Sequence, residues 1–139
     1  MSKTNVQKVI FKNTTAKKLY DLYMNPKQHS NVTGAPAKIS KKAGSSFSAH
    51  ANYITGKNLY LKPNETIVQT WRAESWNKND PDSIFIIRLE QKGKDVVLHA
   101  VHSNVPDRAA ASLSKGWHSH YWNLWKQHLA NKSIKKSAM

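Results

Sequence analysis

Residues 106–130, PDRAAASLSKGWHSHYWNLWKQHLA, have the pattern of one long amphipathic helix. Pro106 suits the first position of a helix, and Asp107 suits its N-terminal turn. With Leu113 set to zero and 100° per residue, the apolar face spans roughly 20° to 80° around the helix. That face holds Trp117, Tyr121, Leu124 and His128. So narrow an apolar face predicts a helix of about 25 residues that packs against the rest of the protein on one side.

Other residues of this helix fall outside the apolar face. The same wheel places Trp125 at about 120°, His118 at about 140° and Trp122 at about 180°. We therefore predict that Trp122 is exposed or lies in a dimer contact. Gly116 costs about 1 kcal/mol in mid-helix relative to alanine. We expect that glycine is needed at this position because the helix approaches the sheet closely, or because the helix bends at the mouth of a cavity.

A run of short β-prone segments, separated by turn signals, precedes the helix and predicts a meander of about six antiparallel strands. The segments are AKISKK (37–42), SSFSAHANYI (45–54), NLYLK (58–62), ETIVQTWRAESW (65–76), SIFIIRLE (83–90) and DVVLHAVHSN (95–104), with turns expected at TGK (55–57) and QKGK (91–94). In SIFIIRLE, one alternating set begins at Phe85 and the other at Ile84. If Phe85 faces the helix, Ile84 and Ile86 lie on the outer face, which points to a second apolar contact such as a dimer.

The N-terminal part predicts one strand and two short helices. Residues 5–12 alternate as a strand, residues 13–15 offer N-caps for a helix over about 15–24, and Pro26 opens a second helix through about Val32. A long helix after a curved antiparallel sheet buries its apolar face in the concavity of that sheet. We therefore predict an α+β, helix-grip fold of about six to seven strands, with a cavity between sheet and helix. We expect a single domain over residues 1–139, frayed from about residue 131.

The net charge is +14, and it comes from 22 basic and 8 acidic residues. Such a charge attracts anionic partners. Only three of the basic residues are arginine, which is the residue best suited to paired contacts with phosphates and guanines. A solvated basic surface is therefore the simpler interpretation, and a nucleic-acid or anionic-surface binder stays open as an alternative.

The residue types argue against several classes of site. The absence of cysteine excludes disulfides, thiolate zinc sites and thiol nucleophiles. His118 and His120 lie about 200° apart on a helix, and His99 and His102 point to opposite faces of a strand, so neither pair chelates locally. We expect no metal and no cofactor. No long apolar run suggests a leader or a membrane span, so we expect a cytoplasmic protein.

Several segments together resemble one known family. They are Gly56 in TGKNLYLKP, IVQTWRAESW (67–76), NVP (104–106), GW (116–117) with Tyr121, and the N-terminal LYDLYMNPKQHSNVTGAPAKIS. In order and spacing they resemble the C-terminal domain of the activator of heat-shock-protein-90 ATPase, within the START-like, SRPBCC superfamily. The resemblance implies the helix-grip fold and a cavity for apolar ligands. It implies function only loosely, because one fold carries many functions.

From these patterns we predict a protein that binds a small apolar, lipid-like or aromatic molecule without catalysis. The residues expected to face the cavity are Phe47, Tyr53, Trp71, Phe85, His102, Trp117 and Tyr121. His102 is expected to be a polar anchor for the ligand, although a hydrogen-bonded core histidine is the commoner role for such a residue. The same seven positions also suit an ordinary core. The main alternative is a co-chaperone-like module that regulates a chaperone ATPase. In either case we expect a monomer or a homodimer.

Overall fold

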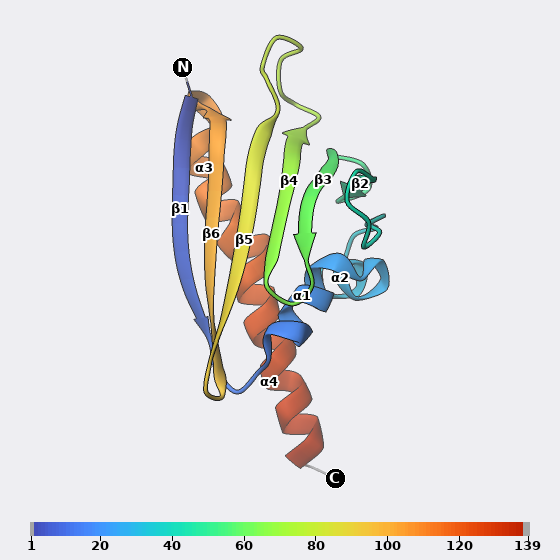
Figure 1. Ribbon diagram of the computed structural model, residues 1–139, viewed down its shortest axis with the longest axis vertical. Coiled ribbons are helices and arrows are strands. Elements are labelled where there is room, and N and C mark those ends of the chain that lie inside the picture. Colours follow the sequence, from blue (N-terminus) through green and yellow to red (C-terminus); the bar gives the residue numbers. More distant parts are fainter. Residues whose placement is uncertain (1, 138–139) are drawn as a thin grey trace.

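The computed structural model describes the backbone of residues 2–137 and the side chains of residues 2–131. It contains a six-stranded antiparallel sheet in the order β1-β6-β5-β4-β3-β2, and the C-terminal helical segment crosses one face of that sheet (Figure 1). The predicted α+β, helix-grip class is confirmed. The strands are β1 (Ser2–Phe11), β2 (Ser46–Ala49), β3 (Ile54–Lys62), β4 (Thr66–Ala73), β5 (Ser83–Lys92) and β6 (Asp95–Pro106). The helical elements are α1 (Ala16–Met24), α2 (Pro26–Thr33), α3 (Asp107–Trp117), η1 (His118–Trp122) and α4 (Asn123–Ser137).

The two short helices form where the sequence predicts them. The Thr15 side chain accepts a hydrogen bond from the Lys18 backbone N–H and so caps α1. Asn25 caps α2 in the same way, with Pro26 in its first turn. Gly34 then ends α2 in the left-handed conformation, at φ 81°. Leu19, Leu22 and the residues around them bury one face of α1 in the core.

Two parts of the predicted meander differ in the structure. Residues 37–42 form no strand and contribute only an isolated bridge between Lys38 and Ser48. The expected turn at residues 55–57 lies inside β3, and the turn falls instead at residues 50–53, within the segment 45–54 predicted as one strand. A Cβ atom on Gly56 would lie 1.9 Å from the Thr70 carbonyl oxygen and 2.6 Å from the Phe47 ring. Glycine is therefore needed here for a close approach within the sheet rather than for a turn.

The alternation predicted for β5 is confirmed. Phe85, Ile87 and Leu89 are buried beneath the helical layer, whereas Ile84 and Ile86 lie half-buried on the outer face. A dimer contact through the outer face stays a prediction.

The long C-terminal helix contains a π-helical turn, η1, that the sequence did not reveal. His118 donates its backbone N–H to the Lys115 carbonyl, and Asn123 donates to the carbonyl of His118, five residues earlier. The carbonyl of Ser114 instead accepts a hydrogen bond of 2.8 Å from Nε2 of Gln7 in β1. Gln7 also accepts a bond of 2.7 Å from Nε1 of Trp122. Gln7 therefore holds both ends of the wide turn.

The π turn corrects the predicted position of Trp122. An extra residue in one turn moves every later residue back by about 100°, so Trp122 shifts to about 80° and Trp125 to about 20°. Both side chains are accordingly buried, with 0% and 1% of their surface exposed. Trp122 is a core residue, and neither exposure nor a dimer contact describes it.

The limits of this helical segment also differ from the prediction. Pro106 is the last residue of β6, and α3 begins at Asp107. At the other end α4 continues to Ser137 and includes most of the tail expected to fray, while residues 138–139 lie outside the described residues. Within the described residues, no helix combines the length and apolar character needed to cross a membrane.

Candidate functional site: an aromatic pocket between helix and sheet

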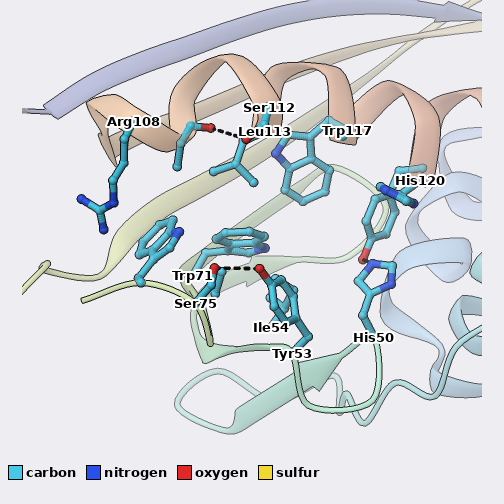
Figure 2. A pocket seen from close by; sticks show the side chains of 15 residues that line it. His50, Tyr53, Ile54, Trp71, Ser75, Arg108, Ser112, Leu113, Trp117 and His120 are labelled. Carbon is cyan, nitrogen blue, oxygen red and sulfur yellow. Dashed lines mark hydrogen bonds between the residues drawn. The ribbon is translucent and has the colours of Figure 1, made fainter. Parts of the chain in front are cut away.

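A pocket of about 530 Å³ opens between the helical segment and the sheet (Figure 2). α3 and η1 form one wall, and β4 with the turn before β3 forms the other. The aromatic side chains that line it are Tyr53, Trp71, Trp76, Trp117 and Tyr121. Figure 2 places Arg108 at one end of the pocket and His50 with His120 at the opposite end. The arrangement suits a flat or elongated apolar molecule with polar contacts at its ends.

The structure divides the seven residues predicted to face a cavity. Tyr53, Trp71, Trp117 and Tyr121 line the pocket. The others are buried but lie outside its lining: Phe47, Phe85 and His102.

Phe85 and Phe47 lie behind the pocket wall for different reasons. The Phe85 ring stacks on the indole of Trp117 at 3.9 Å between centroids and 3° between planes, and so supports that wall from the sheet side. Phe47 packs against the backbone of Gly56, where β2 pairs with β3. Both side chains are buried, as strand alternation suggested, but alternation could not show that Trp117 covers Phe85.

His102 connects the two walls of the pocket instead of anchoring a ligand. Nε1 of Trp117 donates to Nδ1 of His102 over 3.1 Å, and Nε2 of His102 lies 2.7 Å from Oγ of Ser83. Ser83 in turn donates to the backbone carbonyl of Trp71 at 2.7 Å. Since Nδ1 accepts, Nε2 carries the proton and donates to Ser83. Burial lowers the pKa of His102 to about 4, so the neutral ring fixes Trp117 relative to Trp71.

Small residues keep the pocket open on both walls. They are Ala73 and Ser75 on the sheet side, with Ala109, Ser112 and Gly116 on the helix. A Cβ atom on Gly116 would have only a carbon of His120 within 4 Å, at 3.8 Å. The expected close approach of helix to sheet at Gly116 is therefore absent. Gly116 faces the pocket, one residue before the helix enters its wide turn, which fits the second expectation of an irregular helix at a cavity mouth.

A chain of hydrogen bonds closes one end of the pocket, and sequence reasoning missed it. The Tyr121 hydroxyl lies 2.9 Å from Nε2 of His29 and 3.1 Å from Nε2 of His50. Nδ1 of His29 lies 2.8 Å from the backbone carbonyl of Tyr23. His50 reaches this position from a turn in which His50, Ala51 and Asn52 all have positive φ. Such backbone strain is concentrated at functional sites, and periodicity gives no sign of it.

The opposite end of the pocket is charged. Arg108 pairs with Asp80, and this hydrogen bond holds the pKa of the Asp80 carboxyl below its usual range. Arg72 donates to the carbonyls of Asn77 and Asp80 and also pairs with Asp82 at 3.1 Å. The two arginines thereby order the loop between β4 and β5, which carries Ser75 and Trp76 into the pocket wall.

No group of three potential metal ligands occurs within the described residues. His50 and His120 approach each other with ring centroids 5.9 Å apart, and no carboxylate lines the pocket beside them. The pocket therefore offers aromatic surface, hydrogen bonds and one cation.

Comparison with known proteins gives matches over most of the chain. An activator homologue from Dictyostelium discoideum is 28% identical over 99 residues, which are 70% of this chain and 26% of that protein. The human activator of 90 kDa heat shock protein ATPase homolog 1 is 24% identical over 82% of this chain and 33% of its own length. The chain thus spans between a quarter and a third of the length of these relatives.

Solved structures share the fold at low sequence identity. An HSP90 activator from Plasmodium falciparum has a TM-score of 0.82 and 19% identity, and the match covers 94% of this chain and 96% of that chain. CalU16 from Micromonospora echinospora has a TM-score of 0.78 and 15% identity, covering 96% and 80%. The model of the family described as Activator of Hsp90 ATPase homolog 1-like protein matches residues 13–130. Because this match covers most of the sequence, the chain belongs to the Activator of Hsp90 ATPase homolog 1-like family.

Proposed function

We propose that this protein binds a flat, largely apolar small molecule in the pocket between α3–η1 and the sheet, without chemically altering it. The observation that carries the proposal is an aromatic pocket of about 530 Å³, a volume within the usual range of small-molecule sites. Trp71 from the sheet and Trp117 from the helix meet with ring centroids 6.0 Å apart, and together they form part of the apolar lining. A planar ligand would lie against this shared aromatic surface rather than between the two indoles, and it would remain reachable from solvent.

Gly116 supports this proposal, because its presence is unfavourable for the helix itself. Replacing a mid-helix glycine by alanine generally stabilises a helix by about 1 kcal/mol. Nothing except His120 stands close enough to oppose such a change. Gly116 lowers the stability of the helix and leaves empty volume in the pocket. Such a residue is expected where the empty volume serves ligand binding.

Binding rather than catalysis fits the polar groups. His102 and Ser83 bond to each other and to the pocket walls, while His29 and Tyr121 form a second internal chain. No Asp or Glu is among the residues that line the pocket. These groups are arranged to hold side chains in place.

The test is a variant that fills the pocket from the helix. Gly116→Leu is expected to weaken binding of flat aromatic probes by at least about tenfold, because the new side chain occupies ligand volume. It should leave the thermal midpoint unchanged or higher, since a helix-unfavourable residue is removed. Tryptophan fluorescence titration measures the binding, and a melting curve measures the stability. Mass spectrometry of the natively purified protein gives a direct search for a bound compound.

Ala111→Leu is the matched control, because Ala111 is exposed on the same helix and is not part of the pocket lining. It should bind the probes as the wild type does. If Gly116→Leu binds them equally well, the pocket is not the binding site. If a panel of lipid and aromatic compounds neither binds nor raises the melting temperature of the wild type, the proposed function is wrong.

A second candidate function, regulation of a chaperone ATPase by direct contact, is favoured by the outer face of the sheet. An apolar row crosses five paired strands there, and we name it the outer apolar row: Val6, Tyr60, Val68, Ile86 and Val101. Val6 is 73% exposed and Tyr60 53% exposed, so the two ends of the row are open to solvent. The neighbouring row contains Lys8, Arg88 and Lys62. An apolar centre beside basic side chains suits an acidic protein surface.

Tyr60→Ser tests this second candidate. If the wild type changes the turnover of a heat-shock-protein-90-type ATPase, the variant should reduce that change several-fold, because an aromatic side chain is lost from the contact. Gly116→Leu should regulate the ATPase as the wild type does, since Gly116 lies on the opposite side of the sheet. An unchanged effect in Tyr60→Ser would show that the outer apolar row is not the contact. No effect of the wild type at large molar excess would remove the candidate.

A further inference from the structure

The hydrogen bonds at the His50 end of the pocket determine which histidine ring nitrogens carry a proton. His29 is buried, and desolvation lowers its pKa to about 4, so the ring is neutral near pH 7. Its Nδ1 faces the carbonyl oxygen of Tyr23, which can only accept. Nδ1 of His29 therefore carries the proton, and Nε2 is left with a lone pair.

The same reasoning determines the protonation of His50. Since Nε2 of His29 can only accept, the Tyr121 hydroxyl donates its single proton to it. The Tyr121 oxygen can then only accept from His50, so Nε2 of His50 carries a proton. Burial and the neighbouring His120 lower the pKa of His50, which keeps this ring neutral near pH 7 as well. A neutral ring with a protonated Nε2 has an unprotonated Nδ1.

Nδ1 of His50 is therefore a fixed acceptor. No hydrogen bond to it occurs within the described residues, and the ring lines the pocket. Three consecutive residues with positive φ, at 51°, 54° and 72°, hold His50 in this place. None of the three is glycine, so the turn is strained. The strain is consistent with a side chain positioned for a purpose other than the stability of the turn.

We propose that the His50 end of the pocket is a subsite for a hydrogen-bond donor, so that the ligand is a flat apolar molecule with a hydroxyl or N–H group at one end. The inference rests on the proposed binding function and specifies the chemical class of its ligand. A carbonyl or ether oxygen finds no donor on the neutral His50 ring, because the Tyr121 oxygen already accepts from its one N–H group. The aromatic walls would hold the remainder of the ligand.

Two probes of nearly equal size test the subsite: 2-naphthol, which carries a donor, and 2-fluoronaphthalene, which does not. At pH 7.5 we expect the wild type to bind 2-naphthol about tenfold more tightly, as one buried hydrogen bond predicts. Tryptophan fluorescence titration gives both dissociation constants. His50→Asn removes the ring while keeping a residue that tolerates positive φ, so it should reduce the preference to about twofold or less.

His118→Gln is the control, because His118 is exposed on η1 and lies outside the pocket lining. It should keep the wild-type preference. A second variant, Tyr121→Phe, removes the oxygen that fixes the proton on Nε2 of His50, so the preference should fall although His50 is still present. A melting curve for each variant shows that it is folded.

The outcomes separate the subsite from the pocket function. Equal binding of the two probes by the wild type would overturn the subsite and leave pocket binding intact. A preference that survives in His50→Asn would also overturn it, because the donor would then be recognised elsewhere. If the wild type binds neither probe up to its solubility limit, both the subsite and binding of flat aromatic ligands are wrong.

Discussion

At the scale of single residues, histidines are the least expected part of the molecule. The sequence predicts that His102 faces inward, but for the other histidines the spacing mainly argues against metal chelation. The structure shows that His29 and His102 are both buried, at 1% exposure, and that each bonds through both ring nitrogens. Each ring is held neutral between a donor and an acceptor on different elements of the fold.

These two histidines predict how stability depends on pH. Burial lowers the pKa of both to about 4 from the ordinary 6.5, so the unfolded chain takes up protons first as the pH falls. The free energy of unfolding should be level above about pH 6.5 and should decrease toward pH 4, by roughly 3 kcal/mol for each histidine. Urea unfolding between pH 7.5 and 4.5 measures this slope. His102→Gln should remove about half of the part of the slope that these two histidines contribute between pH 6.5 and 5. An undiminished slope in His102→Gln would contradict the assignment.

At the scale of elements, the π turn decides which face of the C-terminal helix is buried. A regular helix would bury Leu124 and His128 and expose Trp122. The structure buries Trp122 and Trp125, while Leu124 and His128 lie half-buried. The sequence could not reveal this, because the turn depends on Gln7, which lies more than one hundred residues away in β1.

Deletion of Ser119 tests the role of this turn. Ser119 is exposed within η1, and removing one residue there should convert the π turn into ordinary helix. Because the wide turn holds one residue more than an ordinary turn, Trp122 and Trp125 keep their positions at about 80° and 20° in the shortened helix. Both should stay buried, and the loss of stability should be smaller than the loss of about 3–5 kcal/mol expected for truncating a buried tryptophan. Ser119→Ala should change stability by less than about 0.5 kcal/mol. Urea unfolding monitored by fluorescence measures both variants. A loss of about 3–5 kcal/mol in the deletion variant would contradict this interpretation of the turn as one inserted residue.

At the scale of the whole molecule, local patterns predicted the order and type of the elements well. Thr15, Pro26 and Gly34 mark the short helices correctly, and the alternation of Phe85 with Ile84 assigns the two faces of β5. The candidate site was predicted less completely. Trp71 and Trp117 follow from periodicity and family resemblance. By contrast, Arg108 and His29 reach the site from the helices α3 and α2, and His50 reaches it from a strained turn. Such placement depends on contacts between distant residues, which spacing along the chain does not encode.

The pairing of β1 with β6 places the first strand beside the sixth, with Ser2 opposite Pro106. During synthesis the first strand therefore emerges long before its partner exists, and its edge stays unpaired until more than one hundred residues have been made. The same strand carries Gln7, which holds the wide turn of the helix that follows β6. Closing so long a loop is slow compared with forming the β4–β5 and β5–β6 hairpins. The aromatic pocket consequently takes its final shape late in folding, when β1 pairs with β6 and Gln7 reaches the helix.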